Sequence, residues 1–336
     1  MSKDTLPRVV VLATGGTIAG SGKSTMSLAE YKAGSLAGTQ LVEAVPELNQ
    51  FARVSVEQVS NLGSSNMTFA IWRALAERIN ALFTADAGIA GVVITHGTST
   101  IEETAYFLNL TVKHDRPVVL VGAQRPATAL SADGPLNLVN AVRVAASADS
   151  RGRGVLVVLN DEINAARDVT KSNTFRAETF RSGELGFLGY VDQDKVAYYR
   201  SPEKRHTVNS EFDLKSIPEL PAVEIVYSSV ESNAPLVVQA LQRAGVRGIV
   251  FAATGAGSLS DLEKQTVQKT LAQGGNTVFV RSSRVGNGRV IGRAEFDAMG
   301  IIAADNLSPQ KARILLMLAL ATTSDPGTLS RMFSEY

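Results

Sequence analysis

The 336-residue sequence contains no cysteine and only three histidines. Without cysteine, disulfides, thiol catalysis and zinc thiolate sites are excluded. The histidines form no cluster with carboxylates at metal-ligand spacing, and no Gly-x-Ser-x-Gly turn supplies the serine of a serine–histidine–acid triad. His96 lies at the end of an expected strand and is predicted to be a packed structural residue rather than a catalytic base.

A strong excess of one charge is also missing, and so are long apolar runs. The 33 Lys and Arg residues nearly balance the 32 Asp and Glu residues, so nucleic acid and anionic membranes are poor candidates as partners. The longest purely apolar stretch, Ile314–Ala321, is too short to cross a bilayer. The polar start MSKDTLPR has no signal-peptide pattern. The chain as it stands is therefore expected in the cytoplasm, or in the periplasm if a signal has been removed.

The sequence does contain a repeated pattern, in which apolar strands end in glycine and hydroxyl residues. Val9–Leu12 has the β-branched composition of a strand buried on both faces, and two glycines and Thr17 follow it. Ser64 and Thr98 follow other expected strands in the same way. Because ligands of open α/β sheets bind at the carboxyl ends of the strands, Thr17 is a candidate nucleophile. Each hydroxyl also fits a simple turn or helix cap, and the residues alone leave that alternative open.

Strands alternate with helices along the chain. This predicts an α/β fold with a mostly parallel, doubly wound sheet in a larger N-terminal domain, followed by a smaller C-terminal α/β domain. Leu41–Phe51 is expected to be a helix, the last long helix is expected to begin after Ser308, and Ser21–Gly38 is expected to be a mobile loop of the kind that forms lids. The predicted catalytic domain, linker and C-terminal domain are residues 1–200, 201–221 and 222–336.

A threonine nucleophile raises the question of what activates it. Gly20–Ser24 ends like a phosphate-binding loop, but Thr17 stands where that motif requires its first glycine, so a nucleotide hydrolase is disfavoured. Threonine is a weak nucleophile that needs a neighbouring base or a proton relay. The residue types available for this task are Lys171, Tyr31 and Glu295. The sequence alone does not show which of them lies in contact with Thr17.

Several longer motifs resemble those of the bacterial type II L-asparaginases. They are ATGGTIAG at Ala13–Gly20, THGT at Thr95–Thr98, RPATALSADGPLNL at Arg125–Leu138 and RDVTK at Arg167–Lys171. They occur in order, with the family's separations, and the likeness extends over residues 6–336. The resemblance implies a two-domain α/β fold, a homotetramer built as a dimer of intimate dimers, and no cofactor. It implies hydrolysis of the side-chain amide of L-asparagine to L-aspartate, with L-glutamine as a second substrate.

The same resemblance implies a role for each matching residue. Thr17 would form the acyl ester, Tyr31 on the lid loop would assist proton transfer, and Thr98 with Lys171 would activate water or relay the proton. Glu295 would come from the neighbouring subunit and contact the substrate amino group and Tyr31. Ser64 would hold the α-carboxylate, and the backbone at Thr98 and Ala123 would border the acyl oxygen. The implied substrate-binding residues are Gly16, Ser64, Ser65, Ser99 and Ala123.

One position departs from the family pattern in a way that affects the substrate. The family has HGTDT, with an aspartate that pairs with the substrate ammonium, where this chain has Ser99. Removing a buried charge partner typically costs on the order of 2–5 kcal/mol. The chain is then either an engineered or weakened variant, an enzyme for an amide without the ammonium, or an enzyme in which Glu295 or another carboxylate compensates. Ala256 and Ser65 are smaller departures, from asparagine and from glutamine or glutamate respectively.

Two functions other than free amide hydrolysis stay open at this point. One is an amino-acid-binding paralogue that has lost turnover, against which the presence of both Thr17 and Lys171 argues. The other is an amidotransferase-type paralogue that acts on an acyl group carried by tRNA. The near-neutral charge and the lack of an added RNA-binding segment disfavour it.

Overall fold

A computed structural model describes residues 5–274 and 276–336 of the chain. The chain forms two compact units, of which the first ends at Ser210 and the second begins at Glu211. This border lies within the segment 201–221 that the sequence predicts to be a linker. Each unit has a sheet of its own, and the two are described separately below.

The first unit is organised around a sheet that has eight strands in its described part. Its central strands β7, β6, β5, β1 and β4 run parallel, as the alternation of strands and helices predicts. In spatial order the strands are β12 (Val196–Tyr198), β11 (Gly189–Val191), β8 (Glu162–Ala165), β7 (Val155–Leu159), β6 (Val118–Val121), β5 (Ile89–Thr95), β1 (Arg8–Gly15) and β4 (Arg53–Leu62).

The antiparallel edge of this sheet was not predicted. Strand β8 turns back along β7, and β11 and β12 continue the antiparallel order. The turn between β7 and β8 consists of Asn160 and Asp161, whose φ angles are +53° and +63°. A two-residue turn with positive φ at both positions suits the twist of a hairpin, and Asn and Asp tolerate that conformation. Asn160 and Asp161 are therefore a local sequence signal for a hairpin, although the general alternation of strands and helices favours a parallel strand at this place.

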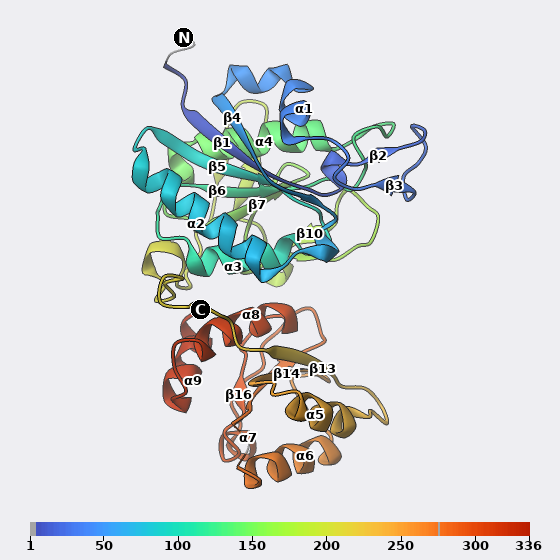
Figure 1. The fold of residues 1–336 in the computed structure, drawn as a ribbon, viewed down its shortest axis with the longest axis vertical. Coiled ribbons are helices and arrows are strands. Elements are labelled where there is room, and N and C mark those ends of the chain that lie inside the picture. The colour runs from blue at the N-terminus through green and yellow to red at the C-terminus, as the bar shows by residue number, and fades with distance from the viewer. Residues whose placement is uncertain (1–4, 275) are drawn as a thin grey trace. The chain divides into compact units, whose positions relative to one another are not determined.

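Helices cover both faces of the first sheet (Figure 1). On one face, Leu41 of α1 (Gly38–Glu43) and Leu138 of α4 (Gly134–Ala146) pack with Val9 and Val11 of β1. The other face carries α2 (Phe69–Ala85) and α3 (Ile101–Thr111), which contact each other. Helices therefore cover both faces of the sheet, and β1 is buried within it, as its continuous apolar composition requires.

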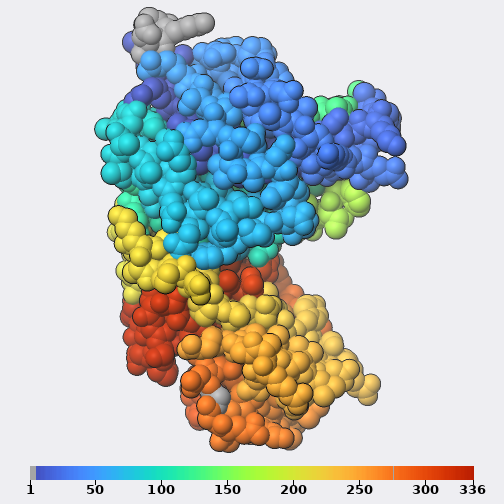
Figure 2. All heavy atoms as spheres, in the orientation of Figure 1, coloured from blue at the N-terminus to red at the C-terminus, as the bar shows by residue number. Residues whose placement is uncertain are grey.

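Two local expectations were wrong in part. The helix predicted over Leu41–Phe51 is instead α1 followed by a separate 3₁₀ turn, Pro46–Gln50, because proline cannot donate a helical hydrogen bond and clashes with the preceding turn. The segment Ser21–Gly38 is not wholly without structure, since β2 (Ser21–Gly22) pairs antiparallel with β3 (Tyr31–Lys32). Figure 2 shows this part of the chain, in blue, projecting from the body of the first unit.

The second unit contains a parallel sheet of four strands in its described part. Val238 of α5, Val267 of α6 and Phe296 of α7 pack with Phe251 of β14, while α8 contacts β13, β14 and β15. The strands are β13 (Val223–Tyr227), β14 (Gly248–Ala253), β15 (Val278–Ser283) and β16 (Ile302–Ala303). The helices are α5 (Ala234–Arg243), α6 (Asp261–Ala272), α7 (Ala294–Asp297), α8 (Pro309–Leu320) and α9 (Pro326–Glu335).

The C-terminal helices partly agree with the sequence analysis. Helix α8 begins after Ser308 with proline at its first position, as predicted, but the Ser308 side chain makes no capping hydrogen bond. It is not the last long helix, because α9 follows. The carboxylate of Asp325 caps α9 by accepting a hydrogen bond from the Thr328 N–H at 2.7 Å. Among the described residues, no helix has the length and apolar composition needed to cross a membrane.

Candidate active site

The strand order of the first sheet creates a crevice beside β1. Strand β4 lies on one side of β1 and β5 on the other. The connection after β1 leads to α1, whereas the connection after β5 leads to α3, on the opposite face of the sheet. Neighbouring connections that leave toward opposite faces open a crevice at the carboxyl ends of the strands. Thr17 follows β1 and Thr98 follows β5, so both threonines lie at this point.

Three backbone segments meet at the floor of the crevice through glycine. Gly16 has a φ of +82°, and a Cβ atom at this position would lie 2.3 Å from the Gly97 nitrogen. A Cβ atom on Gly97 would in turn lie 2.7 Å from the Ser64 Oγ. No side chain fits at either position, since real Cβ atoms do not approach other atoms this closely. The two glycines therefore allow the segments after β1, β4 and β5 to form one continuous surface.

Thr17 and Tyr31 form the first polar pair on this surface. The Thr17 Oγ1 and the Tyr31 Oη are 2.7 Å apart, a short hydrogen bond between hydroxyls. Thr17 is buried in the 3₁₀ turn Thr17–Ala19, and Tyr31 is half-buried on β3. Gly20 lies against the Tyr31 ring, because a Cβ atom at Gly20 would be 2.8 Å from the tyrosine Cδ2. The segment expected to be a lid thus places a phenol directly on the candidate nucleophile.

Lys171 and Thr98 form the second pair. The Lys171 Nζ donates a hydrogen bond to the Thr98 Oγ1 at 2.8 Å. Lys171 lies on β9 (Thr170–Lys171), which pairs antiparallel with β10 (Phe180–Arg181). Burial lowers the pKa of the Lys171 amine, and the negative charge of Glu102 opposes this effect. A lysine with a lowered pKa is more often neutral and can accept a proton.

The pKa of Lys171 should fall further when Glu102 is replaced by glutamine. Glu102 is buried, its Oε1 accepts a hydrogen bond from the Lys171 backbone N–H at 3.4 Å, and its charge favours the ammonium form. If neutral Lys171 is the active form, the acid limb of the pH profile of kcat moves to lower pH in Glu102→Gln. At the pH where the unmodified chain has half its maximal kcat, Glu102→Gln should gain up to ~2-fold relative to its own maximum. The control is Glu103→Gln, on the same turn of α3, and an unmoved or alkaline-shifted limb in Glu102→Gln would contradict the expectation.

The remaining predicted residues of the first unit also lie at strand ends. Ser64 is buried, and its carbonyl accepts a hydrogen bond from the Thr100 Oγ1 at 2.8 Å. Ser65 is exposed. Ser99 is exposed too, and among the described residues its hydroxyl has no hydrogen-bond partner. The Ser99 hydroxyl is therefore available to a ligand.

Ala123 is buried in a loop that a carboxylate holds in place. It follows β6, and the two carboxylate oxygens of Asp133 accept hydrogen bonds from the Gln124 and Arg125 N–H groups, each at 2.9 Å. A Cβ atom on the preceding Gly122 would lie 3.0 Å from the Thr98 Cγ2, so the loops after β5 and β6 are in contact. Asp133 was not singled out from the sequence, nor was Glu102.

Two family models match this chain, one in each of its two units. Residues 8–204 match the family model described as "Asparaginase, N-terminal", and residues 222–333 match the "Glutaminase/Asparaginase C-terminal domain". The chain belongs to the asparaginase family. The resemblance identified from the sequence motifs is thereby confirmed, as is the two-part α/β fold.

Named relatives cover nearly the whole chain. It is 47% identical to "L-asparaginase 2" of Bacillus subtilis over 99% of this chain and 88% of that protein. It is 48% identical to "Glutaminase-asparaginase" of Pseudomonas fluorescens over 100% of this chain and 92% of that protein. A crystal structure described as a probable cytoplasmic L-asparaginase from Campylobacter jejuni matches with a TM-score of 0.95 and 45% identity, covering 98% of this chain and 100% of that one.

Glu295, the remaining predicted site residue of this asparaginase-family chain, belongs to the second unit. It lies on α7, and its carboxylate is 3.9 Å from the Lys264 Nζ. Half of its side chain is exposed. Within the described residues, no group of three or more histidines, cysteines or carboxylates is arranged to hold a metal ion.

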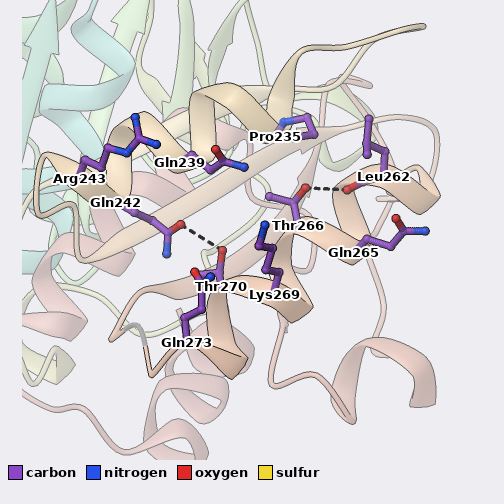
Figure 3. Close-up of a pocket in the computed structure, with 10 residues that line it drawn as sticks. All are labelled: Pro235, Gln239, Gln242, Arg243, Leu262, Gln265, Thr266, Lys269, Thr270 and Gln273. Atoms are coloured by element: carbon purple, nitrogen blue, oxygen red, sulfur yellow. Dashed lines mark hydrogen bonds between the residues drawn. The ribbon is translucent and has the colours of Figure 1, made fainter.

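A separate hollow of about 640 Å³ lies in the second unit between α5 and α6 (Figure 3). Among the described residues that line it, Arg243 and Lys269 are charged, and none is a carboxylate, histidine or tyrosine. The Thr266 hydroxyl donates to the Leu262 carbonyl at 2.7 Å, and the Thr270 hydroxyl donates to the Gln242 Oε1 at 3.1 Å. Because both hydroxyls already donate to other groups, this hollow lacks the paired chemistry seen around Thr17.

Proposed function

We propose that this chain hydrolyses the side-chain amide of L-asparagine to L-aspartate and ammonia, with L-glutamine as a second substrate. The observation that carries the proposal is the pairing of two buried threonine hydroxyls with separate proton-transfer groups at neighbouring strand ends. Thr17 is bonded to Tyr31, and Thr98 is bonded to Lys171. The names L-asparaginase and glutaminase-asparaginase borne by its relatives support this substrate class.

The proposed reaction has an acylation and a deacylation step. The Thr17 Oγ1 attacks the amide carbon, its proton passes to Tyr31 or to the Thr98–Lys171 pair, and the proton is then delivered to the departing nitrogen as ammonia leaves. A water molecule next attacks the ester, breaks its bond to Thr17 and returns a proton to the hydroxyl. Backbone N–H groups at Thr98 and near Ala123 would bind the developing oxyanion, and one such donor is typically worth about 3 kcal/mol of barrier.

The remaining site residues would bind the substrate. Ser64, together with Gly16 and Ser65, would form the pocket for the α-carboxylate. Glu295 would contact the amino group from the neighbouring subunit of a homotetramer. A monomer on a sizing column that retained full activity would contradict this shared-site role.

Ammonia release tests the proposal directly. The unmodified chain is assayed with L-asparagine, L-glutamine, D-asparagine and succinamic acid, which lacks the α-ammonium group. Release from L-asparagine supports the proposed activity. Binding of L-asparagine in a calorimeter without ammonia release from any of these amides would instead favour an amino-acid-binding protein.

Replacing Ser99 by aspartate should raise kcat/KM for L-asparagine. The introduced carboxylate would face the substrate ammonium, and we expect a gain of about tenfold or more. Succinamic acid should not gain, because it carries no ammonium. The matched control is Ser99→Asn, which has the same shape without the charge. If Ser99→Asp and Ser99→Asn behave alike on L-asparagine, another group already holds the ammonium and Ser99 is a tolerated variation.

A further inference from the structure

A buried chain of hydrogen bonds runs behind the candidate active site. The Trp72 Nε1–H donates to the Thr104 Oγ1 at 2.8 Å, and the Thr104 Oγ1 lies 2.9 Å from the His96 Nε2. The His96 Nδ1 lies 2.7 Å from the Gly97 carbonyl oxygen. His96 and Thr104 are fully buried, and Trp72 is nearly so. The chain therefore connects α2 and α3 to the loop that carries Thr98.

The partners determine which nitrogen of His96 carries the proton. The Gly97 carbonyl can only accept, so the His96 Nδ1 must be the donor. The His96 Nε2 then accepts from the Thr104 hydroxyl, whose oxygen accepts from the Trp72 indole. This assignment uses the neutral imidazole, and burial favours the same form by lowering the pKa of His96 to about 4.

The hydrogen bond from the His96 Nδ1 to the Gly97 carbonyl also affects the direction of the Thr98 N–H. The carbonyl of residue 97 and the N–H of residue 98 belong to one planar unit, so fixing one fixes the direction of the other. Thr98 is buried, and its N–H donates to no acceptor in the described part of the chain. A buried N–H without a protein partner is costly, and such a group is suited to a ligand oxygen.

We propose that His96 is a positioning residue, which holds the Gly97–Thr98 peptide so that the Thr98 N–H points at the acyl oxygen. The inference rests on the proposed amide hydrolysis and deepens it. Thr104 and Trp72 contribute by fixing the ring and tautomer of His96. The adjoining backbone leaves the peptide little room to adjust, because Gly97 is in close contact with both Gly16 and Ser64.

Two substitutions of His96 distinguish the roles of its two ring nitrogens. His96→Asn keeps an N–H donor near the place of Nδ1, whereas His96→Gln keeps a polar atom near the place of Nε2 and loses the donor to Gly97. Donation to an oxyanion matters mainly in the transition state, so His96→Gln should lower kcat for L-asparagine by about 10- to 100-fold with little change in KM. His96→Asn should recover kcat to within about threefold of the unmodified chain.

The fold of each variant is checked by Trp72 fluorescence, since Trp72 is the single tryptophan of the chain. Its ring stacks on Phe107 at a centroid distance of 5.1 Å, so disturbed packing should shift its emission. Unmodified kcat in His96→Gln, or equal losses of kcat in both variants, would overturn the positioning role alone. An unmodified chain that released ammonia from none of the amides would overturn the proposed function and this inference together.

Discussion

Replacing Thr17 by alanine should reduce ammonia release from L-asparagine by about 10⁴- to 10⁶-fold, the range seen when a nucleophilic enzyme loses its attacking hydroxyl. The structure gives the reason, because the Thr17 Oγ1 is the buried hydroxyl paired with the Tyr31 Oη at 2.7 Å. Residual binding of the substrate should persist, since Ser64 and the surrounding backbone are untouched. The measurement is steady-state ammonia release together with calorimetric binding of L-asparagine.

Thr17→Ser is the matched control because it keeps the hydroxyl and removes only a methyl group. It should retain most of the activity that Thr17→Ala loses. A second readout is the acyl-enzyme itself, which mass spectrometry of quenched reactions should detect in Thr17→Ser and not in Thr17→Ala. If Thr17→Ala kept more than about 1% of kcat, attack by this hydroxyl would be excluded.

The central sheet and the place of the crevice could be predicted from the sequence. The apolar run Val9–Leu12 lies within β1, and Thr17 and Thr98 follow adjacent parallel strands. That result needs only the rule that parallel strands share a carboxyl edge. The single helix predicted over Leu41–Phe51 was wrong, because Pro46 lacks the N–H and the space that a helix interior requires.

The pairing of the side chains could not be predicted in the same way. Tyr31 reaches Thr17 through a two-residue strand pair inside a polar loop, and Lys171 reaches Thr98 from a short antiparallel pair far along the chain. Neither pair has a repeating hydrophobic pattern that would set its register. In the sequence, only the resemblance to the family connects Tyr31 with Thr17 and Lys171 with Thr98.

Asp133 shows a further limit of local sequence signals. It precedes Gly134 and Pro135 at the start of α4, which is typical of a helix cap. Its side chain makes no capping hydrogen bond to α4, and its carboxylate instead accepts hydrogen bonds from the backbone N–H groups of Gln124 and Arg125. A carboxylate at a helix start can therefore serve a neighbouring loop, and only tertiary structure distinguishes the two uses.

Replacing Lys171 by methionine should lower kcat by about 10²- to 10⁴-fold, as expected when a proton-transfer group is removed. Methionine approximates the length of the lysine stem, so the loss would report on the amine that donates to the Thr98 Oγ1 at 2.8 Å. Because burial lowers the pKa of Lys171, the acid limb that depends on this amine should lie below the pH range of a solvent-exposed lysine. This acid limb should be absent from the pH profile of the residual activity of Lys171→Met.

Lys171→Arg distinguishes proton transfer from simple charge. Arginine keeps the positive charge but is not deprotonated in proteins, so it cannot accept a proton from Thr98 or from water. If Lys171 acts by proton transfer, Lys171→Arg should be as inactive as Lys171→Met, and KM should change less than kcat in both. Activity restored by arginine would show that a fixed cation beside Thr98 is sufficient. The relay would then have to run through Tyr31, the other proton-transfer group bonded to a threonine of the site.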